Sequence, residues 1–302
     1  MAVIETIAPI FLIIIFGYVI QKKGFLKTEF ISEANRFVFL FPLPVLVFMG
    51  IVKSNVKDVS ASHILSVIFA TFTMLGFSFL LGILFKLKNG KLGSFIQTTF
   101  HGNVSYIGLA VLFYMLGEEG LKKGSLLIGI LILVNNTLAI IVLHWTSRQH
   151  EDVSKALLSI IRTPIIVATF LGILFLYIKI PIPVILFRGM GILANIALPL
   201  ALIVIGASIT ISTIKNSLKL SVVISFLKLI GLPCLSLLFC GLLSTPLREA
   251  LPGIILLATP TATTSYILAR ELDGDMELAS GAVTLSTLIS PVTFVLWAYM
   301  LT

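Results

Sequence analysis

Two hydrophobic stretches of the chain are interrupted by polar residues, and both interruptions run into the same tripeptide. The first covers Thr98–Val104 and the second covers Thr259–Thr264, and each is followed by Ser-Tyr-Ile. The two tripeptides begin 160 residues apart (265 − 105), about half of the 302-residue chain. Broken helices in matching positions of two halves are typical of a transporter's binding site near the bilayer midplane. The pattern therefore predicts one solute site built from both interruptions.

Each interruption contains residues that break a helix. Pro260 removes a backbone donor and disfavours helical geometry at the residue before it, so we expect a break over Thr259–Thr263. The first interruption has no proline. Gly102 followed by Asn103 is its weakest point, and Gly108 is a second.

A broken helix exposes amides at one half and carbonyls at the other, and the amide end suits a carboxylate. Side-chain hydroxyls and amides beside the breaks would add hydrogen bonds. The candidate substrate-binding residues are His101, Gly102, Asn103, Ser105, Asn136, Lys228, Thr259, Pro260, Thr261, Thr263, Thr264 and Ser265. The alternative is that the hydroxyls only cap freed carbonyls or join helices, as Ser and Thr often do in membranes.

Three of these candidates lie in apolar runs and each has two interpretations. Lys228 either reaches the membrane interface with its long side chain or faces the second break as a fixed positive charge that attracts an anion and replaces a coupling cation. His101 is either a proton-carrying group or a hydrogen-bonded packing residue. At least one amide of the Asn135–Asn136 pair should face the protein interior.

Every Asp and Glu falls in a loop or at the end of an apolar run. Carriers driven by protons or sodium commonly place a carboxylate inside the membrane, so this distribution argues against a cation/proton antiporter. We also find no metal-ligand cluster, no nucleophile–base set and no cofactor motif, and therefore expect neither a metal, a cofactor nor an enzyme.

Composition defines the class of protein. Hydrophobic residues make up 58% of the chain and charged residues 11%, and the mean hydropathy is +1.13. These values are typical of an all-α integral membrane protein. The net charge of +8 is explained by Lys and Arg in short loops, so we expect no nucleic-acid partner, only the lipid bilayer and a small solute. The sequence does not distinguish a monomer from a homodimer.

The apolar runs predict about ten membrane spans, at 4–21, 35–52, 62–85, 92–117, 123–146, 164–180, 185–211, 219–244, 250–270 and 278–301. Odd-numbered loops carry Lys22, Lys23, Lys27, Arg36, Lys86, Lys88, Lys91, Arg148, Lys155, Arg162, Lys215, Lys219 and Arg270. Even-numbered loops carry Lys53, Lys57, Lys122, Lys123, Lys179, Arg188 and Arg248. Odd-numbered loops thus hold thirteen basic residues and even-numbered loops hold seven. This excess predicts that the odd-numbered loops lie in the cytoplasm and that both termini lie outside the cell membrane. Residues 151–161 are amphipathic and form either a surface helix or a plain linker.

An internal repeat divides the chain. Pro9 and Pro164, in the first and sixth spans, are separated by 155 residues (164 − 9), as are Pro44 and Pro199 in the second and seventh (199 − 44). The two interruptions are separated by 160 residues. We predict two five-span repeats, residues 1–150 and 151–302, within one membrane domain. Because five is odd, the repeats enter the bilayer from opposite sides, which is how alternating access is built.

Several motifs resemble the auxin efflux carrier family, in its bacterial form, over nearly the whole chain. They are Pro9-Ile10-Phe11 through Gly17-Tyr18 with Lys22–Leu26, Asn35 with Leu43-Pro44, Gly102-Asn103 with Gly108-Leu109, Leu198-Pro199, and Thr259–Ser265. The resemblance implies a fold like that of bile-acid sodium symporters, in which spans 4 and 9 cross at their breaks and spans 1, 2, 6 and 7 form a scaffold. It also implies transport of organic anions such as auxin, malate or malonate. One departure is Ala110, where the family usually has proline, so the first break is expected to shift toward Gly102-Asn103.

These observations predict a secondary active or facilitated transporter of a small organic anion that works by alternating access. A sodium-coupled organic-anion symporter of the bile-acid type is the alternative, and sodium dependence separates the two. A membrane sensor that binds a ligand without moving it is a more remote alternative.

Overall fold

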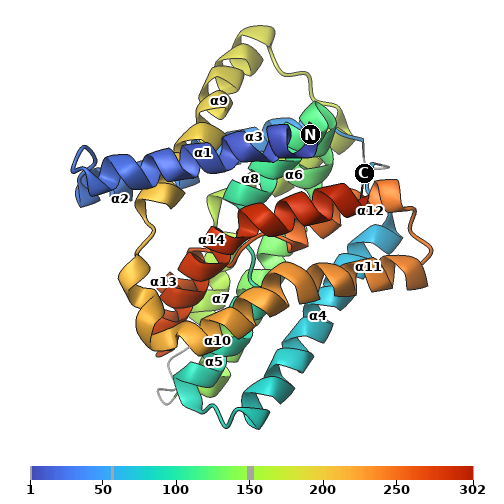
Figure 1. Cartoon of the computed structure of the whole chain (residues 1–302). Coiled ribbons are helices and arrows are strands. Elements are labelled where there is room, and N and C mark those ends of the chain that lie inside the picture. The colour runs from blue at the N-terminus through green and yellow to red at the C-terminus, as the bar shows by residue number, and fades with distance from the viewer. Residues whose placement is uncertain (1, 56–57, 148–152, 302) are drawn as a thin grey trace. The chain divides into compact units, whose positions relative to one another are not determined.

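The computed structural model describes residues 2–55, 58–147 and 153–301, and in these ranges helix is the only regular structure apart from one isolated β-bridge (Figure 1). The α-helices are α1 Ala2–Lys22, α2 Thr28–Leu40, α3 Pro42–Val52, α4 Ala61–Leu84, α5 Asn89–Phe100, α6 Leu109–Thr146, α7 Val153–Ile161, α8 Pro164–Ile178, α9 Val184–Ala207, α10 Ile214–Phe226, α11 Leu232–Leu242, α12 Leu247–Leu257, α13 Thr264–Glu271 and α14 Met276–Leu301. Short π-helical turns, η2 Val104–Gly108 and η4 Leu227–Gly231, and a 3-10 turn, η3 Ile211–Thr213, complete the described elements. The all-α prediction is confirmed.

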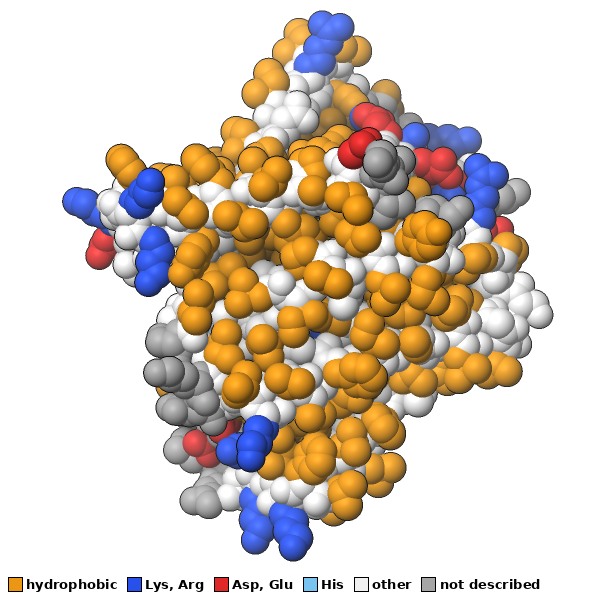
Figure 2. All heavy atoms as spheres, viewed as in Figure 1, with side chains coloured by type: hydrophobic (Ala, Val, Ile, Leu, Met, Phe, Trp, Pro, Cys, Tyr) orange, Lys and Arg blue, Asp and Glu red, His pale blue; other side chains and the backbone are white. Residues whose placement is uncertain are grey.

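The outer surface of the helices is apolar. Side chains such as Ile185, Tyr299 and Val292 are 88%, 80% and 72% exposed. Hydrophobic side chains cover most of the face shown in Figure 2. Within the described residues, seven helical segments are long and apolar enough to cross a membrane, or eight if the bent α7–α8 pair counts as one span. The chain is therefore an integral membrane protein.

The expected spans coincide with helices, but several are interrupted. The second span is divided at Phe41, whose φ of −125° and ψ of −72° are not helical, and Pro42 begins α3. Within α6, Gly117 has φ 62° and ψ −146°, which separates a helical piece ending the fourth span from one forming the fifth. The eighth span is continuous from α10 to α11 through η4, a turn that shifts the helical register.

The chain forms two compact units, each with segments from both halves of the sequence. The first unit holds α1, α2, α3, α8 and α9 together with residues 105–130. Within it α1 packs on α9, and α3 packs on α8 and α9. Gly17 lies against the backbone of Ile203 and Gly206 lies against that of Ile14, so glycine allows α1 and α9 to approach closely.

The second unit holds α4, α5, α7, residues 131–146 of α6, and α10–α14. Within it α10 packs on α14, α11 on α4 and α12, and α13 on α5 and α14. The start of α14 is tied to α5, because the Asp275 amide donates to Ser94 Oγ at 2.8 Å and Asp275 Oδ1 accepts from the Leu278 amide at 2.9 Å. These contacts hold α5, the first half of the interrupted fourth span, together with α12 and α13 of the ninth in one unit.

The amphipathic segment expected at 151–161 forms α7, which begins at Val153. The helical interpretation is thus confirmed over the described part, whereas residues 151 and 152 lie outside it. The predicted boundary between the repeats, at 150/151, also lies outside the described residues.

We expect Gly206→Ala to destabilise the first unit, because the new methyl group would overlap the Ile14 carbonyl group. Overpacking of this kind costs about 1–3 kcal/mol, which thermal unfolding of the detergent-solubilised protein would record as a lower midpoint. Gly189→Ala is the matched control on the same helix, since nothing lies within 4 Å of its new Cβ. Equal midpoints for the two variants would contradict the close packing of α1 and α9.

Candidate functional site

The first interruption is a true break in the helix. Helix α5 ends at Phe100, His101 takes an extended conformation (φ −74°, ψ 90°), and the chain becomes helical again only at Val104. The break lies at the Gly102-Asn103 pair, as the sequence predicted, and not at Gly108, which is part of the π-helical turn.

The second interruption is longer. Helix α12 ends at Leu257 and α13 begins at Thr264, with Pro260 near the middle of the connecting segment. This confirms the break predicted over Thr259–Thr263. The proline cannot donate a backbone hydrogen bond, so the carbonyls at the end of α12 need other partners.

The two breaks lie side by side. Gly102 and Thr261 form an isolated antiparallel bridge, in which the Asn103 amide donates to the Pro260 carbonyl and the Ala262 amide donates to the His101 carbonyl, both at 2.8 Å. Two segments 159 residues apart in sequence (261 − 102) thus pair like a minimal β-ladder inside a helical protein. We refer to residues 101–103 and 258–263, with this bridge, as the crossing.

Hydroxyl groups of the second break satisfy carbonyls that the breaks leave free. Thr261 Oγ1 donates to the Thr98 carbonyl at 2.9 Å, and Thr259 Oγ1 donates to the Leu256 carbonyl at 2.7 Å. Both threonines are fully buried. Their capping role is therefore part of the structure, which is the alternative that the sequence left open for these residues.

Lys228 reaches the crossing from η4. Its side chain is 0% exposed, and Nζ donates to the Leu257 carbonyl, the last of α12, at 2.6 Å. Nζ also lies close to Gly102, since a Cβ built on that glycine would be 3.0 Å away. Lys228 thus faces the break and does not extend to the membrane interface. Among the described residues it forms no ion pair; the pairs found are Arg36–Glu33, Lys53–Glu118 and Lys123–Glu119.

Gln97 was missed by the sequence analysis. It is fully buried one turn before His101, and its Nε2 donates to the Ser265 carbonyl at 2.9 Å, so it joins α5 to the start of α13. Ser286 of α14 was also missed, and its Oγ accepts from the Thr261 amide at 3.1 Å. A single amide or hydroxyl in an apolar run does not by itself predict a functional residue. Gln97 and Ser286 also lie outside the two matching interruptions that the sequence analysis identified.

The remaining candidate residues differ in their burial and in their place relative to the crossing. Ser265 is buried, Thr263 and Thr264 are half-buried, and Thr264 Oγ1 lies 3.4 Å from His101 Nε2. Ser105 is half-buried just beyond the first break. No hydrogen bond links Asn136 to the crossing in the described part of the chain. Its neighbour Asn135 is the buried amide of the pair, and both of its amide atoms lack a hydrogen-bond partner.

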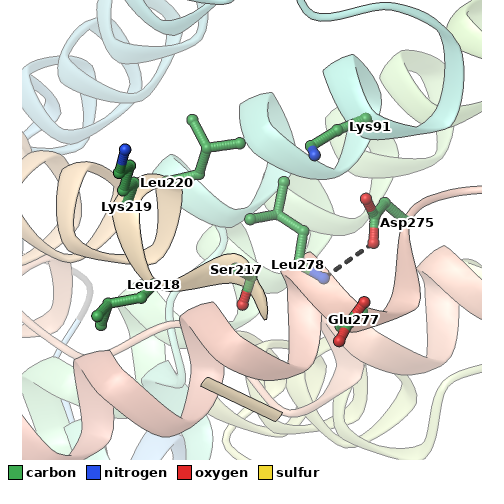
Figure 3. Close-up of a pocket in the computed structure, with 8 residues that line it drawn as sticks. All are labelled: Lys91, Ser217, Leu218, Lys219, Leu220, Asp275, Glu277 and Leu278. Carbon is green, nitrogen blue, oxygen red and sulfur yellow. Dashed lines mark hydrogen bonds between the residues drawn. The ribbon is translucent and has the colours of Figure 1, made fainter. Parts of the chain in front are cut away.

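A hollow of about 450 Å³ lies in the same unit but at the opposite end of α5 (Figure 3). It is lined by Lys91, Ser217, Leu218, Lys219, Leu220, Asp275, Glu277 and Leu278. Lys91 and His101 are ten residues apart, or about 15 Å along a helix, so the hollow is distinct from the crossing. Its basic and acidic side chains favour no single ligand charge.

Broken, internally paired helices in an apolar all-helical chain are the arrangement of a membrane transport protein. Residues 2–298 match the family model described as "Membrane transport protein". The chain therefore belongs to this family, that of the auxin efflux carriers.

Relatives of similar length match nearly the whole of this chain. An "Uncharacterized transporter" of Methanothermobacter thermautotrophicus is 25% identical, over 98% of both chains. An uncharacterized transporter of Methanocaldococcus jannaschii is 24% identical, also over 98% of both. A Rhizobium meliloti protein with the name "Putative malonate transporter" is 24% identical over 95% of this chain and 92% of its own.

Gly102→Ala should disrupt the crossing, because the added methyl group would overlap Thr259 Oγ1 and press on Lys228 Nζ. We expect a loss of stability of about 1–3 kcal/mol, measured as a lower midpoint of thermal unfolding. Gly76→Ala, in α4 of the same unit, adds a methyl group with nothing within 4 Å and serves as the control. An unchanged midpoint for Gly102→Ala would show that the crossing is looser than described.

Proposed function

We propose that this protein is a secondary carrier that moves a small organic anion, with one or two carboxylates, across the membrane by alternating access. The anion is held at the crossing. The observation that carries the proposal is the buried ammonium group of Lys228 beside both breaks, without a carboxylate partner in the described part of the chain.

A buried charge costs several kcal/mol unless it is paired, so an unpaired lysine at membrane depth marks a functional position. The Leu257 carbonyl supplies one hydrogen bond to Nζ, but an ammonium group has three donors and a full charge. A substrate carboxylate supplies the missing opposite charge. Malonate is the first substrate to test, because one relative of similar length carries that name.

Backbone and side-chain donors at the crossing support the same substrate class. Helix α13 and the turn η2 both begin at the breaks, and the start of a helix carries a partial positive charge. The side chains of Asn103, Thr263 and Thr264 lie at these starts. We propose that they orient the carboxylate, while Thr259 and Thr261 keep the breaks open by capping carbonyls.

Alternating access requires two related halves, and we propose ten spans arranged as an inverted repeat of residues 1–150 and 151–302. The 43-residue segment Val104–Thr146 is about 65 Å long at helical rise, twice the hydrocarbon thickness, and bends at Gly117. Spans 4 and 9 consist of short helices divided by the breaks. The compact units support the repeat, since the first holds spans 1 and 2 of one half and their counterparts 6 and 7 of the other. We further propose that the carrier lies in the cell membrane with both termini outside, on the basis of the loop charges.

Proteoliposomes that contain the purified protein should accumulate labelled malonate or another short carboxylate, and Lys228→Met should reduce uptake at low substrate by about ten- to hundredfold. This range corresponds to the roughly 1.5–3 kcal/mol of a charge-assisted hydrogen bond. Methionine keeps an unbranched side chain, one heavy atom shorter than that of lysine, and removes the charge.

Lys219→Ala is the matched control, because Lys219 is an exposed lysine on the helix that leads to η4. It should transport like the wild type. Uptake by Lys228→Met equal to that of Lys219→Ala would contradict the role of the ammonium group. Failure of every short carboxylate to enter or to compete would contradict the proposed function.

Asn103→Ala tests the placement of the substrate at the first break. Asn103 is buried there, and its backbone amide donates to the Pro260 carbonyl, a bond that the substitution leaves in place. We expect an increase in KM of about five- to fiftyfold, in the range of one hydrogen bond at a buried site. Equal uptake by the variant and the wild type would exclude Asn103 from the site.

A further inference from the structure

The hollow at the start of α5 presents charges of both signs. Lys91 and Lys219 are its basic side chains, Asp275 and Glu277 are its acidic ones, and in Figure 3 Lys219 lies across the view from the two carboxylates. Its volume of about 450 Å³ falls in the range of roughly 300–1,000 Å³ that is usual for small-molecule sites. In the described part of the chain no ion pair joins Lys91 to either carboxylate. The opposite charges thus line one cavity without meeting in it.

Two helix starts form one wall of the hollow. The Asp275 amide donates to the Gly90 carbonyl at 3.2 Å, which places the start of α14 beside the start of α5. Asp275 Oδ1 accepts from the Leu278 amide, so this carboxylate already caps α14. Glu277 is exposed in the first turn of the same helix, and Lys91 is exposed in the first turn of α5. Lys91 and Glu277 are therefore the charged groups best placed to contact a ligand.

The hollow lies at the edge of the apolar surface. Its walls come from the third, seventh and ninth loops of the proposed ten spans, which all lie on the side that we propose to be cytoplasmic. Leu218 lines the hollow and is also the first of three exposed apolar residues on one face of α10, Leu218, Val222 and Phe226. This apolar stripe is about 12 Å long at helical rise, most of the roughly 15 Å of hydrocarbon in one leaflet.

We propose that the hollow binds the head group of a phospholipid that carries both a phosphate and a primary ammonium group, as phosphatidylethanolamine does, with an acyl chain along the apolar stripe. Charged pockets between membrane helices suit lipid head groups. The Lys91 ammonium group binds the phosphate, and the Glu277 carboxylate accepts hydrogen bonds from the lipid ammonium group. A purely anionic head group would face the carboxylates of the hollow unfavourably, and a water-soluble ligand would make no use of the stripe.

Thermal unfolding of the delipidated protein in detergent tests this site with three lipids of identical acyl chains. Phosphatidylethanolamine has both groups, phosphatidylcholine has no N–H donor on its ammonium group, and phosphatidylglycerol has no ammonium group. We expect phosphatidylethanolamine to raise the midpoint by at least about 3 °C and the other two by less than about 1 °C, because a bound ligand stabilises the folded state. Glycerophosphoethanolamine, the head group without acyl chains, should leave the midpoint unchanged at the same concentration.

Two variants test the assigned contacts by titration with each lipid. Lys91→Gln should weaken the binding of phosphatidylethanolamine about three- to tenfold, as expected for the loss of a charge-assisted hydrogen bond at an exposed position. Its control is Lys88→Gln, at an exposed lysine before α5 that is not among the described lining residues. Glu277→Lys should reverse the preference, so that phosphatidylglycerol stabilises more than phosphatidylethanolamine. Glu271→Lys adds the same charge at the exposed end of α13 and should keep the preference of the wild type.

Three outcomes overturn the inference. The first is an equal rise of the midpoint with all three lipids, and the second is a response of Lys91→Gln and Glu277→Lys that matches their controls. The third is a rise with glycerophosphoethanolamine as large as that with the lipid, which would assign the hollow to a free head group. None of these measurements depends on transport, so the inference is tested separately from the proposed carrier function.

Discussion

The need to pair backbone groups inside a water-free interior determines how this protein is built. Each interruption of a helix frees amides and carbonyls that cost several kcal/mol if they stay unpaired in lipid. The protein pairs them across the two breaks, by the Asn103–Pro260 and Ala262–His101 hydrogen bonds. Because each break supplies the partners of the other, neither would be stable alone. This mutual dependence explains why two segments so distant in sequence must meet.

The close approach of two side chains to the backbone of Gly102 accompanies that pairing. Gly102 lies against Thr259 and Lys228 with no space for a Cβ, so glycine is needed for contact as well as for the break. The register of Lys228 depends on η4, since a π-turn adds a residue to the helical repeat and rotates the residues that follow. The Trp297 indole donates to the Leu229 carbonyl at 2.8 Å, which anchors this turn to α14. A charged side chain is thus fixed in the interior by a local helical defect and a neighbouring helix.

The sequence predicted the breaks well because their causes are local. Pro260 cannot continue a helix, and Gly102 with Asn103 is a weak point in any apolar run. The orientation of Lys228 was not predictable, because helical periodicity does not reveal a π-turn whose stability comes from tertiary packing. Gln97 and Ser286 escaped notice for a related reason: each partner atom, the Ser265 carbonyl or the Thr261 amide, becomes available only once the breaks exist. The two matching interruptions thus predicted where the helices break, whereas the side-chain contacts around the breaks depend on tertiary packing.

The proposed anion site depends on side-chain charge and not on the helix dipoles. Helices α5 and α12 end there, each with about −0.5 of an elementary charge, and η2 and α13 begin there, each with about +0.5. These four helix ends cancel to first order, as they must in any crossing of two broken helices, so the helix ends alone select neither sign. The side chains decide. In a cation-coupled carrier a carboxylate or a bound ion would shift the balance, but in the described part of this chain the basic side chain buried beside both breaks is that of Lys228. In the anion carrier that we propose, Lys228 therefore supplies the positive charge that the four helix ends do not.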